Sequence, residues 1–546
     1  MPPECRSQEF GRRFSAEWNL FSAFRCSANR ISNSTQSERS VVLPASITRG
    51  HILMKIIIIL FLLLCPAVSR AQVYSARTDT IPQPYPSPVP CPGSSCSGGG
   101  ALTGANTIIT PSDFNLPITR ITDQNTGVNL GGAAHFAFLV NCGGSAETNF
   151  MNRLDNRMTM CDGGSAEHVF IWNVASKTAT ESYLLTTNAS SLFWSFTQNY
   201  VAYDVEWCGV GSNDVCIESY DFTTAASPTK TQLVDLSSTC GITTAHGDYT
   251  DDVSVSQDDQ TFGTVLSTTA GQGSSRVVYA IAWNRTNGCR VFNTSTASMS
   301  GSWGSTGSAS LNDTYSIHNV RVSPGGTWMR VGPSTCTGGG CTSAVGTYTW
   351  QIATTNVYRT MVVDSSNGCG HEALGYSKMI NQCAGGGLDQ AFWIRPNNVN
   401  DGSGTLLPAS NPPNHGSGFD NHMSWPNDNS TDTNPFCTST VYNSQFAPVF
   451  AWDHEILCVA TSGSGLVWRF AHTYATEKSQ FFAPANAIGA LSQDGKWFAW
   501  ASDWDGMLGS TSGSASCTIG ADCRADVFIM QLPIGSPPTN LKLTVH

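Results

Sequence analysis

Charged side chains are scarce in this sequence, and the basic ones are the scarcer kind. Asp, Glu, Lys and Arg make up 12% of the 546 residues, and the formal net charge is −11. Nucleic acids and anionic membranes are bound through a basic face, so we expect neither as a partner. The chain also lacks the Gly-x-Ser-x-Gly, P-loop and His-Glu-x-x-His motifs. The sequence therefore gives no motif support to a serine hydrolase, a nucleotide-binding protein or a zinc protease of the classes that carry these motifs.

The one strongly apolar segment near the N-terminus, Ile56–Leu64, is too short and wrongly flanked for a membrane span. Lys55 before it and small residues after it are typical of a secretory signal peptide over residues 54–71. Residues 1–53 show no apolar periodicity, and we interpret them as an over-extended gene model ahead of a true start at Met54. A long atypical leader is the alternative. The sequence thus predicts a secreted or periplasmic protein.

The cysteines contain no Cys-x-x-Cys spacing, so the sequence gives little support to a thiolate metal site. Sixteen of the nineteen cysteines follow the predicted signal peptide, which is an even number. In an oxidising compartment, disulfides between close sequence neighbours are the simplest assignment. The predicted pairs are Cys91/Cys96, Cys142/Cys161, Cys208/Cys216, Cys240/Cys289, Cys336/Cys341, Cys369/Cys383, Cys437/Cys458 and Cys517/Cys523.

A recurring hairpin pattern determines the predicted fold. After a Pro/Ser/Gly-rich linker at residues 72–111, an alternating strand, a Ser-x-Asp/Gly turn and a second strand recur through residues 112–546. The clearest copies are Val253–Phe262, Val320–Trp328 and Ala490–Trp500. Repeats of this size predict one small sheet per unit, with the sheets arranged radially around an axis. We therefore predict an all-β fold, a disulfide-stapled β-propeller.

Seven four-stranded blades fit the pattern best, with six or eight as alternatives. The strand Leu116–Thr122 is left over, and we expect it to complete the last blade, since such closure removes free sheet edges. The predicted units cover residues 125–186, 187–240, 241–310, 311–367, 368–417, 418–480 and 481–535.

The hairpin motif resembles that of the TolB/WD40-like secreted β-propellers. The inner hairpin of that family reads Ser-Pro-Asp-Gly-Lys before an aromatic-rich strand, and Ser492–Trp500 matches it well, while Ser323–Trp328 matches it fairly. The resemblance covers roughly residues 112–535. It implies an architecture and not an activity.

Three histidines follow one another at the same place in successive units. His318, His371 and His422 are separated by 53 and 51 residues, and Asp251 holds the comparable position in the unit before them. Near the start of the innermost strands, these side chains would converge at the mouth of the central channel. Three imidazoles and a carboxylate are a suitable ligand set for a divalent metal such as Mn, Ca or Zn. The alternative is that they hydrogen-bond between blades and bind no ion.

The histidine-bearing strands also resemble those of the oligogalacturonate lyases. The resemblance implies a metal held by several histidines and a glutamine at the channel mouth, and cleavage of uronic-acid oligomers by β-elimination. Arg321, close to His318, is the candidate for the arginine of that family. Its glutamine and its proton-abstracting base have no assigned counterpart here.

The fifteen tryptophans raise the possibility of carbohydrate binding, because exposed indole rings stack on sugar faces. Most of them lie within alternating strands and are expected to pack between blades. Trp425 and Trp504 lie beside turns, and with Arg321 they are the predicted ligand-binding residues.

We therefore expect a monomeric extracellular propeller that binds a small-molecule or oligosaccharide ligand at its channel mouth. A metal-dependent polysaccharide lyase that uses the same mouth is the first alternative, and a protein-interaction scaffold is the second. No catalytic residue is assigned.

Overall fold

The computed structural model divides the chain into two units, residues 1–68 and 69–546. All described residues belong to the second unit, so the predicted leader and signal peptide lie outside them. The structure describes residues 74–93, 96, 101–130, 138–140, 149–162, 166–185, 192–208, 214–242, 253–267, 277–333, 347–360, 369–385, 388–400, 404–407, 419–426, 429–442, 448, 451–476, 488–514, 516–518 and 522–535. Within these ranges, no side chain is described at residues 369–371, 382–391, 406, 419–422 and 441–442.

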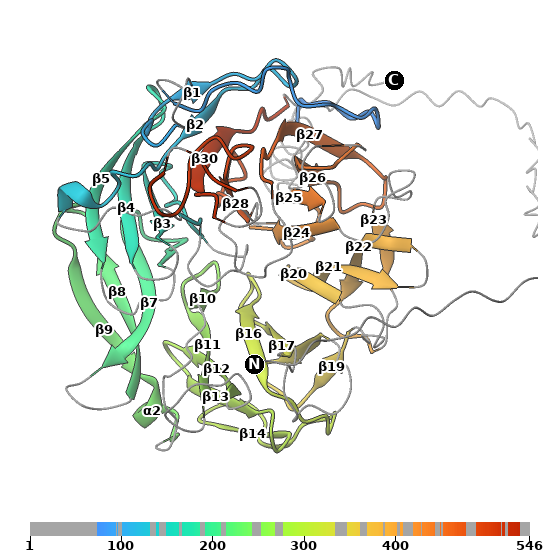
Figure 1. Cartoon of the computed structure of the whole chain (residues 1–546). Coiled ribbons are helices and arrows are strands. Elements are labelled where there is room, and N and C mark those ends of the chain that lie inside the picture. The colour runs from blue at the N-terminus through green and yellow to red at the C-terminus, as the bar shows by residue number, and fades with distance from the viewer. Residues whose placement is uncertain are drawn as a thin grey trace, which may run out of the picture. The chain divides into compact units, whose positions relative to one another are not determined.

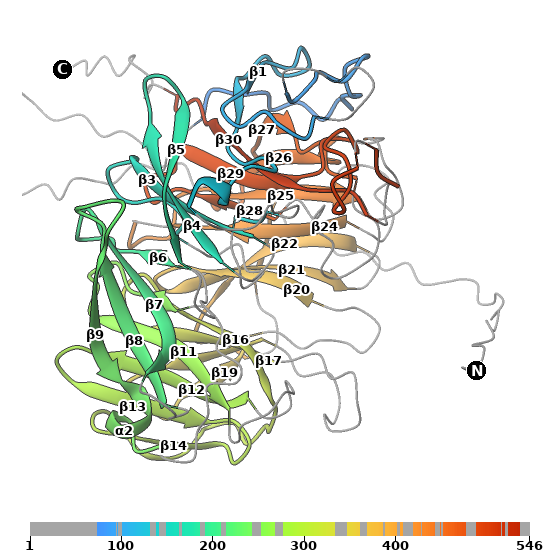
Figure 2. The same cartoon turned by 60° about the vertical axis from the view of Figure 1, so that its left-hand side comes forward.

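Seven antiparallel sheets surround a central axis, so the predicted seven-bladed propeller is confirmed (Figure 1). Six of the sheets each fall within one predicted unit, and the seventh combines strands of the last unit with two strands that precede the first unit. In blades 3 to 6 the first strand along the chain lies nearest the axis (Figure 1), and successive blades stack face to face (Figure 2).

The blades are numbered along the chain. Blade 1 contains β3 (Arg157–Cys161), β4 (Glu167–Asn173) and β5 (Thr178–Leu185). Blade 2 contains β6 (Phe193–Trp194), β7 (Val201–Cys208), β8 (Asp214–Asp221) and β9 (Thr229–Asp235), followed by the short helix α2 (Leu236–Thr239). Blade 3 contains β10 (Ser254–Val255), β11 (Thr261–Ser267), β12 (Val277–Asn284), β13 (Gly288–Asn293), β14 (Ser298–Gly301) and β15 (Gly307–Ser308). Blade 4 contains β16 (Ile317–Val322), β17 (Trp328–Pro333), β18 (Tyr348–Gln351) and β19 (Val357–Arg359).

The remaining blades follow the same order. Blade 5 contains β20 (Cys369–Leu374), β21 (Lys378–Gly385), β22 (Leu388–Pro396) and β23 (Thr405–Leu407). Blade 6 contains β24 (Phe419–Ser424), β25 (Phe436–Tyr442), β26 (Glu455–Val459) and β27 (Val467–His472). Blade 7 contains β28 (Gly489–Leu491), β29 (Trp497–Ser502) and β30 (Asp526–Gln531), joined by β2 (Ile118–Arg120) and β1 (Ile108–Ile109).

The leftover strand closes the ring as predicted. β2 pairs antiparallel with β30, and Ile118 lies opposite Met530. A segment from the start of the domain therefore completes the sheet formed by its end. This pairing covers an edge of β30 that would otherwise be open to other chains.

The side chains of the inner hairpin turn explain why its motif recurs. In blade 7, Ser492 Oγ accepts a hydrogen bond from the Trp497 amide at 2.9 Å and donates one to Asp494 Oδ1 at 2.8 Å. Ser256 and Asp258 make the same two bonds in blade 3. Gly495 has a φ of 71°, a left-handed conformation that glycine adopts without strain. The serine and the acidic residue therefore fix the turn and need no ligand.

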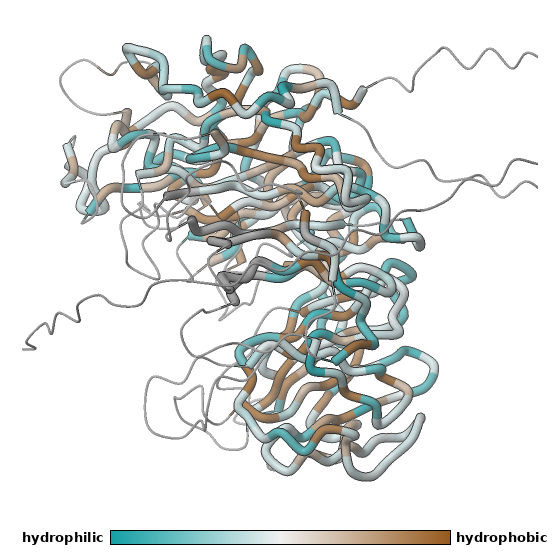
Figure 3. The backbone as a smooth tube through the Cα atoms, turned by 90° about the vertical axis from the view of Figure 1, so that its right-hand side faces the viewer, coloured by the Kyte–Doolittle hydropathy of each residue, from teal (hydrophilic) through white to brown (hydrophobic). Residues whose placement is uncertain are grey.

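Hydrophobic residues are concentrated along the strands, and many turns are hydrophilic (Figure 3). The core clusters join residues of neighbouring blades. One cluster joins Val169 of blade 1 to Ala202 and Tyr220 of blade 2. Another brings Trp172 of blade 1 against Trp497 of blade 7, with ring centroids 5.4 Å apart and nearly perpendicular planes. Tryptophans in alternating strands thus pack between blades, as the sequence predicts.

Five of the predicted disulfides are present among the described residues, namely Cys91–Cys96, Cys208–Cys216, Cys240–Cys289, Cys437–Cys458 and Cys517–Cys523. Cys240 follows α2 of blade 2 and Cys289 lies in β13, so this disulfide joins two blades. Cys369 and Cys383 face each other in the β20–β21 ladder. The predicted partners Cys142, Cys336 and Cys341 lie outside the described residues. Such a set of disulfides is compatible with an extracellular or periplasmic protein.

Residues 74–93, within the predicted linker, lie against blades 6 and 7, and we call them the strap. Tyr74 is buried in a core cluster with Trp468 and Phe470. The amide of Ser75 donates to Pro533 O at 2.8 Å, and the Trp504 indole donates to Pro90 O at 2.8 Å. Across the part of the chain that the structure describes, no helix is long and apolar enough to cross a membrane.

Candidate ligand site in the central channel

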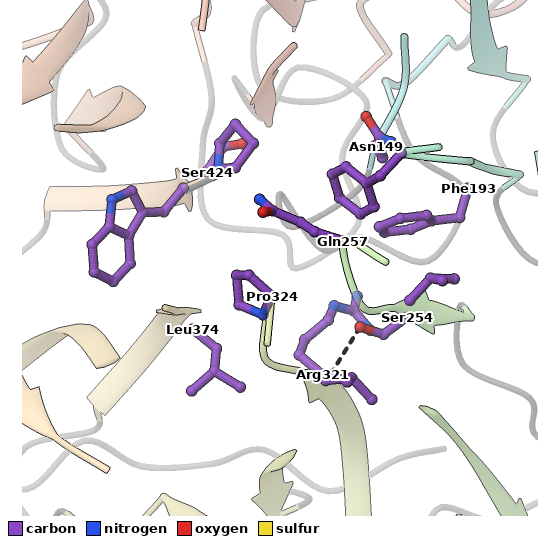
Figure 4. Close-up of a pocket in the computed structure, with 13 residues that line it drawn as sticks. Asn149, Phe193, Ser254, Gln257, Arg321, Pro324, Leu374 and Ser424 are labelled. Atoms are coloured by element: carbon purple, nitrogen blue, oxygen red, sulfur yellow. Dashed lines mark hydrogen bonds between the residues drawn. The ribbon is translucent and has the colours of Figure 1, made fainter. Parts of the chain in front are cut away.

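The inner strands enclose a pocket on the propeller axis, which we call the axial pocket. Its volume is about 60 Å³. The residues that line it come from blades 1 to 6 and surround the channel (Figure 4). They are Asn149, Phe193, Phe196, Ser254, Val255, Gln257, Arg321, Val322, Pro324, Leu374, Ser424, Trp425 and Pro426.

Two of the three predicted ligand-binding residues meet in this pocket. Arg321 is buried near the end of β16, and it is the only charged residue among the described residues of the lining. Its side chain extends toward Ser254 of blade 3 (Figure 4), and its Nη1 donates to Val320 O at 2.8 Å. Trp425 follows β24 and is also buried, and its indole nitrogen donates to Asn434 O at 2.8 Å. The ring of Trp425 therefore offers the pocket an apolar surface.

The third predicted residue, Trp504, lies elsewhere. Its ring is fully buried and stacks on Phe528, with centroids 4.4 Å apart. It belongs to the core cluster of blades 6 and 7 beneath the strap. The structure thus brings Arg321 and Trp425 together but does not bring Trp504 to them.

Hydrogen bonds between blades fix the wall of the axial pocket. Ser254 Oγ accepts from the Val322 amide of blade 4 at 2.9 Å, the bond drawn in Figure 4. Ser424 Oγ accepts from the Leu491 amide of blade 7 at 2.9 Å. Each serine therefore ties its inner strand to the next blade and sets the spacing of the wall.

Asn149 contributes a buried acceptor to the lining. Its Nδ2 donates to Trp194 O, and its Oδ1 has no hydrogen-bond partner among the residues that the structure describes. A buried oxygen without a partner is costly, so such atoms commonly mark the place of a water or a ligand.

A wider cavity of about 240 Å³ adjoins the axial pocket at the end of the channel where the inner hairpins turn. The two share Phe196 and Gln257, and the wider one is also lined by Arg153, Gln493 and Asp494. Gln493 is held in place because its amide donates to Met151 O at 3.3 Å and to Ser195 O at 3.0 Å. The axial pocket therefore continues into a polar vestibule.

Asp155, a second acidic residue near the vestibule, has a raised pKa. Asp155 lies in a turn of blade 1, with Lys496 Nζ 3.9 Å from its Oδ2. Burial, followed by the charge of Asp494, raises the pKa of Asp155 to about 7. The pair formed by Asp155 and Asp494 can therefore hold a shared proton near neutral pH.

The predicted metal ligands are only partly within the described residues. His318 is the second residue of β16 and is exposed. His371 and His422 lie in β20 and β24, the first strands of blades 5 and 6, but their side chains are not described. Asp251 lies outside the described residues.

The backbone nevertheless relates these histidines to the pocket. The residues three positions after them are Arg321, Leu374 and Trp425, and all three line the axial pocket. A strand rises by about 3.3 Å per residue, so the histidine backbones lie about 10 Å farther along the channel. The histidines and the pocket are therefore at two different levels of one channel.

Several lining residues were not predicted, namely Asn149, Phe193, Phe196 and Gln257. The position between the serine and the acidic residue of the inner turn could have revealed one of them. Gln257, Pro324 and Gln493 all occupy this middle position, and all three line the channel cavities. The turn motif thus indicates which side chain faces the axis as well as where the strand reverses.

No protein-family model matches the chain, and no curated protein matches it either. Its fold is similar to that of solved propellers. An oligogalacturonate lyase from Vibrio parahaemolyticus is 10% identical over 78% of this chain and 96% of its own, with a TM-score of 0.49. An oligogalacturonate lyase in complex with manganese is 10% identical over 84% of this chain and 99% of its own, with a TM-score of 0.48. TolB from Acinetobacter baumannii is 13% identical over 66% of each chain, with a TM-score of 0.28. At such identities the similarity concerns the fold alone.

Proposed function

We propose that this protein is a secreted propeller that binds an acidic saccharide, or a chemically similar hydroxy acid, in its central channel. The observation that supports the proposal is the composition of the axial pocket. Arg321 supplies a guanidinium, Asn149 a buried acceptor, and Trp425 an aromatic ring within one lining. A guanidinium matches a carboxylate in shape and charge, and a free carbonyl oxygen accepts from a hydroxyl group.

The sizes of the two cavities indicate how such a ligand would lie. The axial pocket of about 60 Å³ has room for a carboxylate group or a few waters, and not for a whole sugar ring. The vestibule of about 240 Å³ is wider and polar, with Arg153 and Gln493 in its wall. We therefore expect the carboxylate end to enter toward Arg321 and the remaining sugar to occupy the vestibule.

Calorimetric titration with trigalacturonate, and with an uncharged trisaccharide of the same size, tests the proposal. The acidic ligand should bind and the neutral one should bind at least about tenfold more weakly, because it lacks the carboxylate. Arg321→Lys keeps the charge but loses the fork of donors, so binding should weaken by about tenfold.

Arg359→Met is the matched control, since Arg359 lies in β19 of the same blade, part-exposed and away from the axial pocket. It should bind like the parent protein. Equal binding of both saccharides, or equal losses in the two variants, would contradict the proposal and favour a scaffold that binds proteins on its loops.

A metal-dependent lyase is the second candidate, and one observation favours it. Because the residues three positions after His318, His371 and His422 converge on one pocket, the three histidine backbones occupy comparable levels of the channel wall. Neutral imidazoles at one level are a suitable ligand set for Mn or Zn.

Elemental analysis of the purified protein and of His371→Ala tests this candidate. We expect one equivalent of metal in the parent protein and a loss in the variant. Ultraviolet absorbance of unsaturated product during incubation with oligogalacturonate then tests the lyase activity. Protein that contains no stoichiometric metal would rule out this candidate and leave the binding proposal intact.

A further inference from the structure

Two carboxyl groups at the edge of the vestibule share a single lysine. Asp494 lines the vestibule from the inner turn of blade 7, and Asp155 of blade 1 lies within hydrogen-bond reach of it. Lys496 Nζ contacts Asp494 Oδ2 and lies 3.9 Å from Asp155 Oδ2. We call these three side chains the vestibule cluster. One ammonium group cannot neutralise two ionised carboxylates, so the cluster has an excess negative charge unless it binds a proton.

The neighbours of Asp155 on blade 7 place this proton on Asp155. They are Asp494, Lys496 and the side chain of Trp497, which forms a hydrogen bond with Asp155. Burial, followed by the negative charge of Asp494, raises the pKa of Asp155 to about 7, although Lys496 acts in the opposite direction. Asp494 accepts hydrogen bonds from Ser492 Oγ at 2.8 Å and from the Lys496 amide at 3.0 Å, which stabilise its ionised form. The cluster is therefore neutral when the proton is bound and negative when it is lost.

Blade 1 contributes two arginines near the cluster, and only one of them lines the vestibule. Arg157 Nη1 donates to Asn156 O at 2.9 Å, and its guanidinium lies 5.3 Å from the ring of Tyr200. Arg153 lines the vestibule, and its Nη1 donates to Thr197 O at 2.7 Å. No carboxylate among the described residues forms an ion pair with Arg153. A guanidinium has five N–H donors, so Arg153 offers the cavity a positive charge and further donors.

The acceptor that holds Arg153 is itself fixed by a buried carboxylate of blade 3. Asp259 is 3% exposed and accepts from the Phe196 amide at 3.1 Å and the Thr197 amide at 3.0 Å. The Ser195 hydroxyl also donates to Asp259, at 2.5 Å. These bonds fix the loop that carries the Phe196 ring, which lines both cavities, and the carbonyl of Thr197. Arg153 is therefore held at the vestibule before any ligand arrives.

We propose that the vestibule cluster makes ligand binding pH-dependent, because its proton decides whether the cavity is cationic and accepts an anionic ligand or is neutral and binds it more weakly. The inference rests on the proposed function, since it requires an acidic saccharide in the vestibule. With the proton bound, the charge of Arg153 is unopposed. Without it, the excess negative charge of the cluster cancels that of Arg153. No histidine is present among the described residues of the two linings, so the cluster is the group there that titrates near neutral pH.

Calorimetric titration of the protein with trigalacturonate at about pH 5.5 and at about pH 8.5 tests the proposal, since the ligand carboxylates are ionised at both values. The affinity of the parent protein should fall by about fivefold at the higher pH, the effect of one charge about 8 Å away in a polar cavity. Near neutral pH, titrations in buffers of different ionisation enthalpy should show that binding takes up a fraction of a proton.

Two variants change the cluster in different ways. Asp155→Asn removes the titrating group and keeps its shape, so it should bind trigalacturonate equally at both pH values and take up no proton. Lys496→Met removes the cation that favours the ionised form of Asp155, so the fall in affinity should move to higher pH. Because the Lys496 side chain is 47% exposed, this variant keeps the test available if Asp155→Asn does not fold.

Asp221→Asn is the matched control, since Asp221 ends β8 of blade 2, is exposed and lines neither cavity. It should keep the pH profile of the parent protein. An affinity of the parent protein that is equal at both pH values would overturn the inference and leave the proposed function intact. A pH dependence that Asp155→Asn retains in full would also overturn it. Trigalacturonate that binds at neither pH would instead contradict the proposed function, and the inference with it.

Discussion

Two buried networks of charged side chains lie on different sides of the propeller and differ in how completely they are satisfied. In blade 6, Arg469 forms a bidentate pair with Glu455, at 2.7 Å and 2.6 Å, and a third bond of 3.0 Å reaches Asp79 of the strap. Nearby, both ring nitrogens of His472 have partners. Its Nδ1 contacts Asp113 Oδ2, and its Nε2 lies 2.9 Å from the carbonyl oxygen of Gln83. In blade 2, by contrast, Glu218 is buried and has an oxygen with no described partner.

The difference separates a structural network from a candidate ligand site. Where every strong donor and acceptor of a buried network has a partner, the network contributes to the stability and specificity of the fold. Such a network does not indicate a ligand site. Where a buried polar atom has none, the fold carries a cost that a ligand, a proton or a water can remove. Asn149 in the axial pocket and Glu218 in β8 both belong to this second kind.

The largest expected effect comes from breaking the satisfied network. Arg469→Met should lower the free energy of unfolding by about 3–5 kcal/mol, because it leaves Glu455 buried without its cation. Urea unfolding monitored by tryptophan fluorescence would measure the loss. Arg359→Met removes a part-exposed ion pair with Asp313 instead, and should cost at most about 1 kcal/mol. Similar losses in the two variants would show that the buried Arg469–Glu455 pair does not stabilise the fold more than an exposed ion pair does.

A smaller effect is expected at the carboxyl pair of blades 7 and 1. Because the pKa of Asp155 is raised from 3.8 to about 7, the folded protein binds a proton more tightly than the unfolded chain. This contribution is present in full below pH 3.8 and is lost as the pH rises through about 7. Asp155→Asn should remove this pH dependence and stabilise the protein at pH 8 by roughly 1–2 kcal/mol. A parallel pH profile for the variant and the parent protein would contradict this assignment.

The smallest expected effect concerns the unsatisfied network. The pKa of Glu218 is raised above 4.5 by burial, so its contribution to stability is present below pH 4.5 and is lost as the pH rises through the folded-state value. Glu218→Gln should therefore leave stability at neutral pH unchanged or raise it by about 1 kcal/mol, as thermal unfolding would show. A variant that is clearly less stable than the parent protein at neutral pH would mean that Glu218 has a partner of its own.

Much of the fold could be predicted from the sequence because its signals are local. The Ser-x-Asp/Gly turn recurs because its side chains bond within the turn itself, as at Ser492 and Asp494. The leftover strand was identifiable because Ile118 and its neighbours alternate like the other strands but precede the first complete unit. Disulfides between close cysteines follow from their spacing and require no knowledge of distant contacts.

The site could be predicted only in part, because it depends on which positions converge at the axis. Arg321 and Trp425 were found from their positions relative to the repeated histidines, whereas Asn149 lies in the poorly marked first blade. The buried carboxylates of blade 2 were missed for a different reason. Alternating polar residues such as Asp204 and Glu206 ordinarily lie on a solvent-facing side of a sheet. In a propeller both sides of the middle strands are covered by neighbouring blades, so the same pattern buries them.

The central claim is that the axial pocket binds an acidic saccharide through Arg321 and Asn149. A crystal structure of the protein soaked with digalacturonate tests it most directly. We predict difference density on the propeller axis, with a carboxylate against the Arg321 guanidinium and a hydroxyl within hydrogen-bond distance of Asn149 Oδ1. Ordered saccharide on the outer faces of the blades, or an axial pocket that holds only water at saturating ligand, would contradict it.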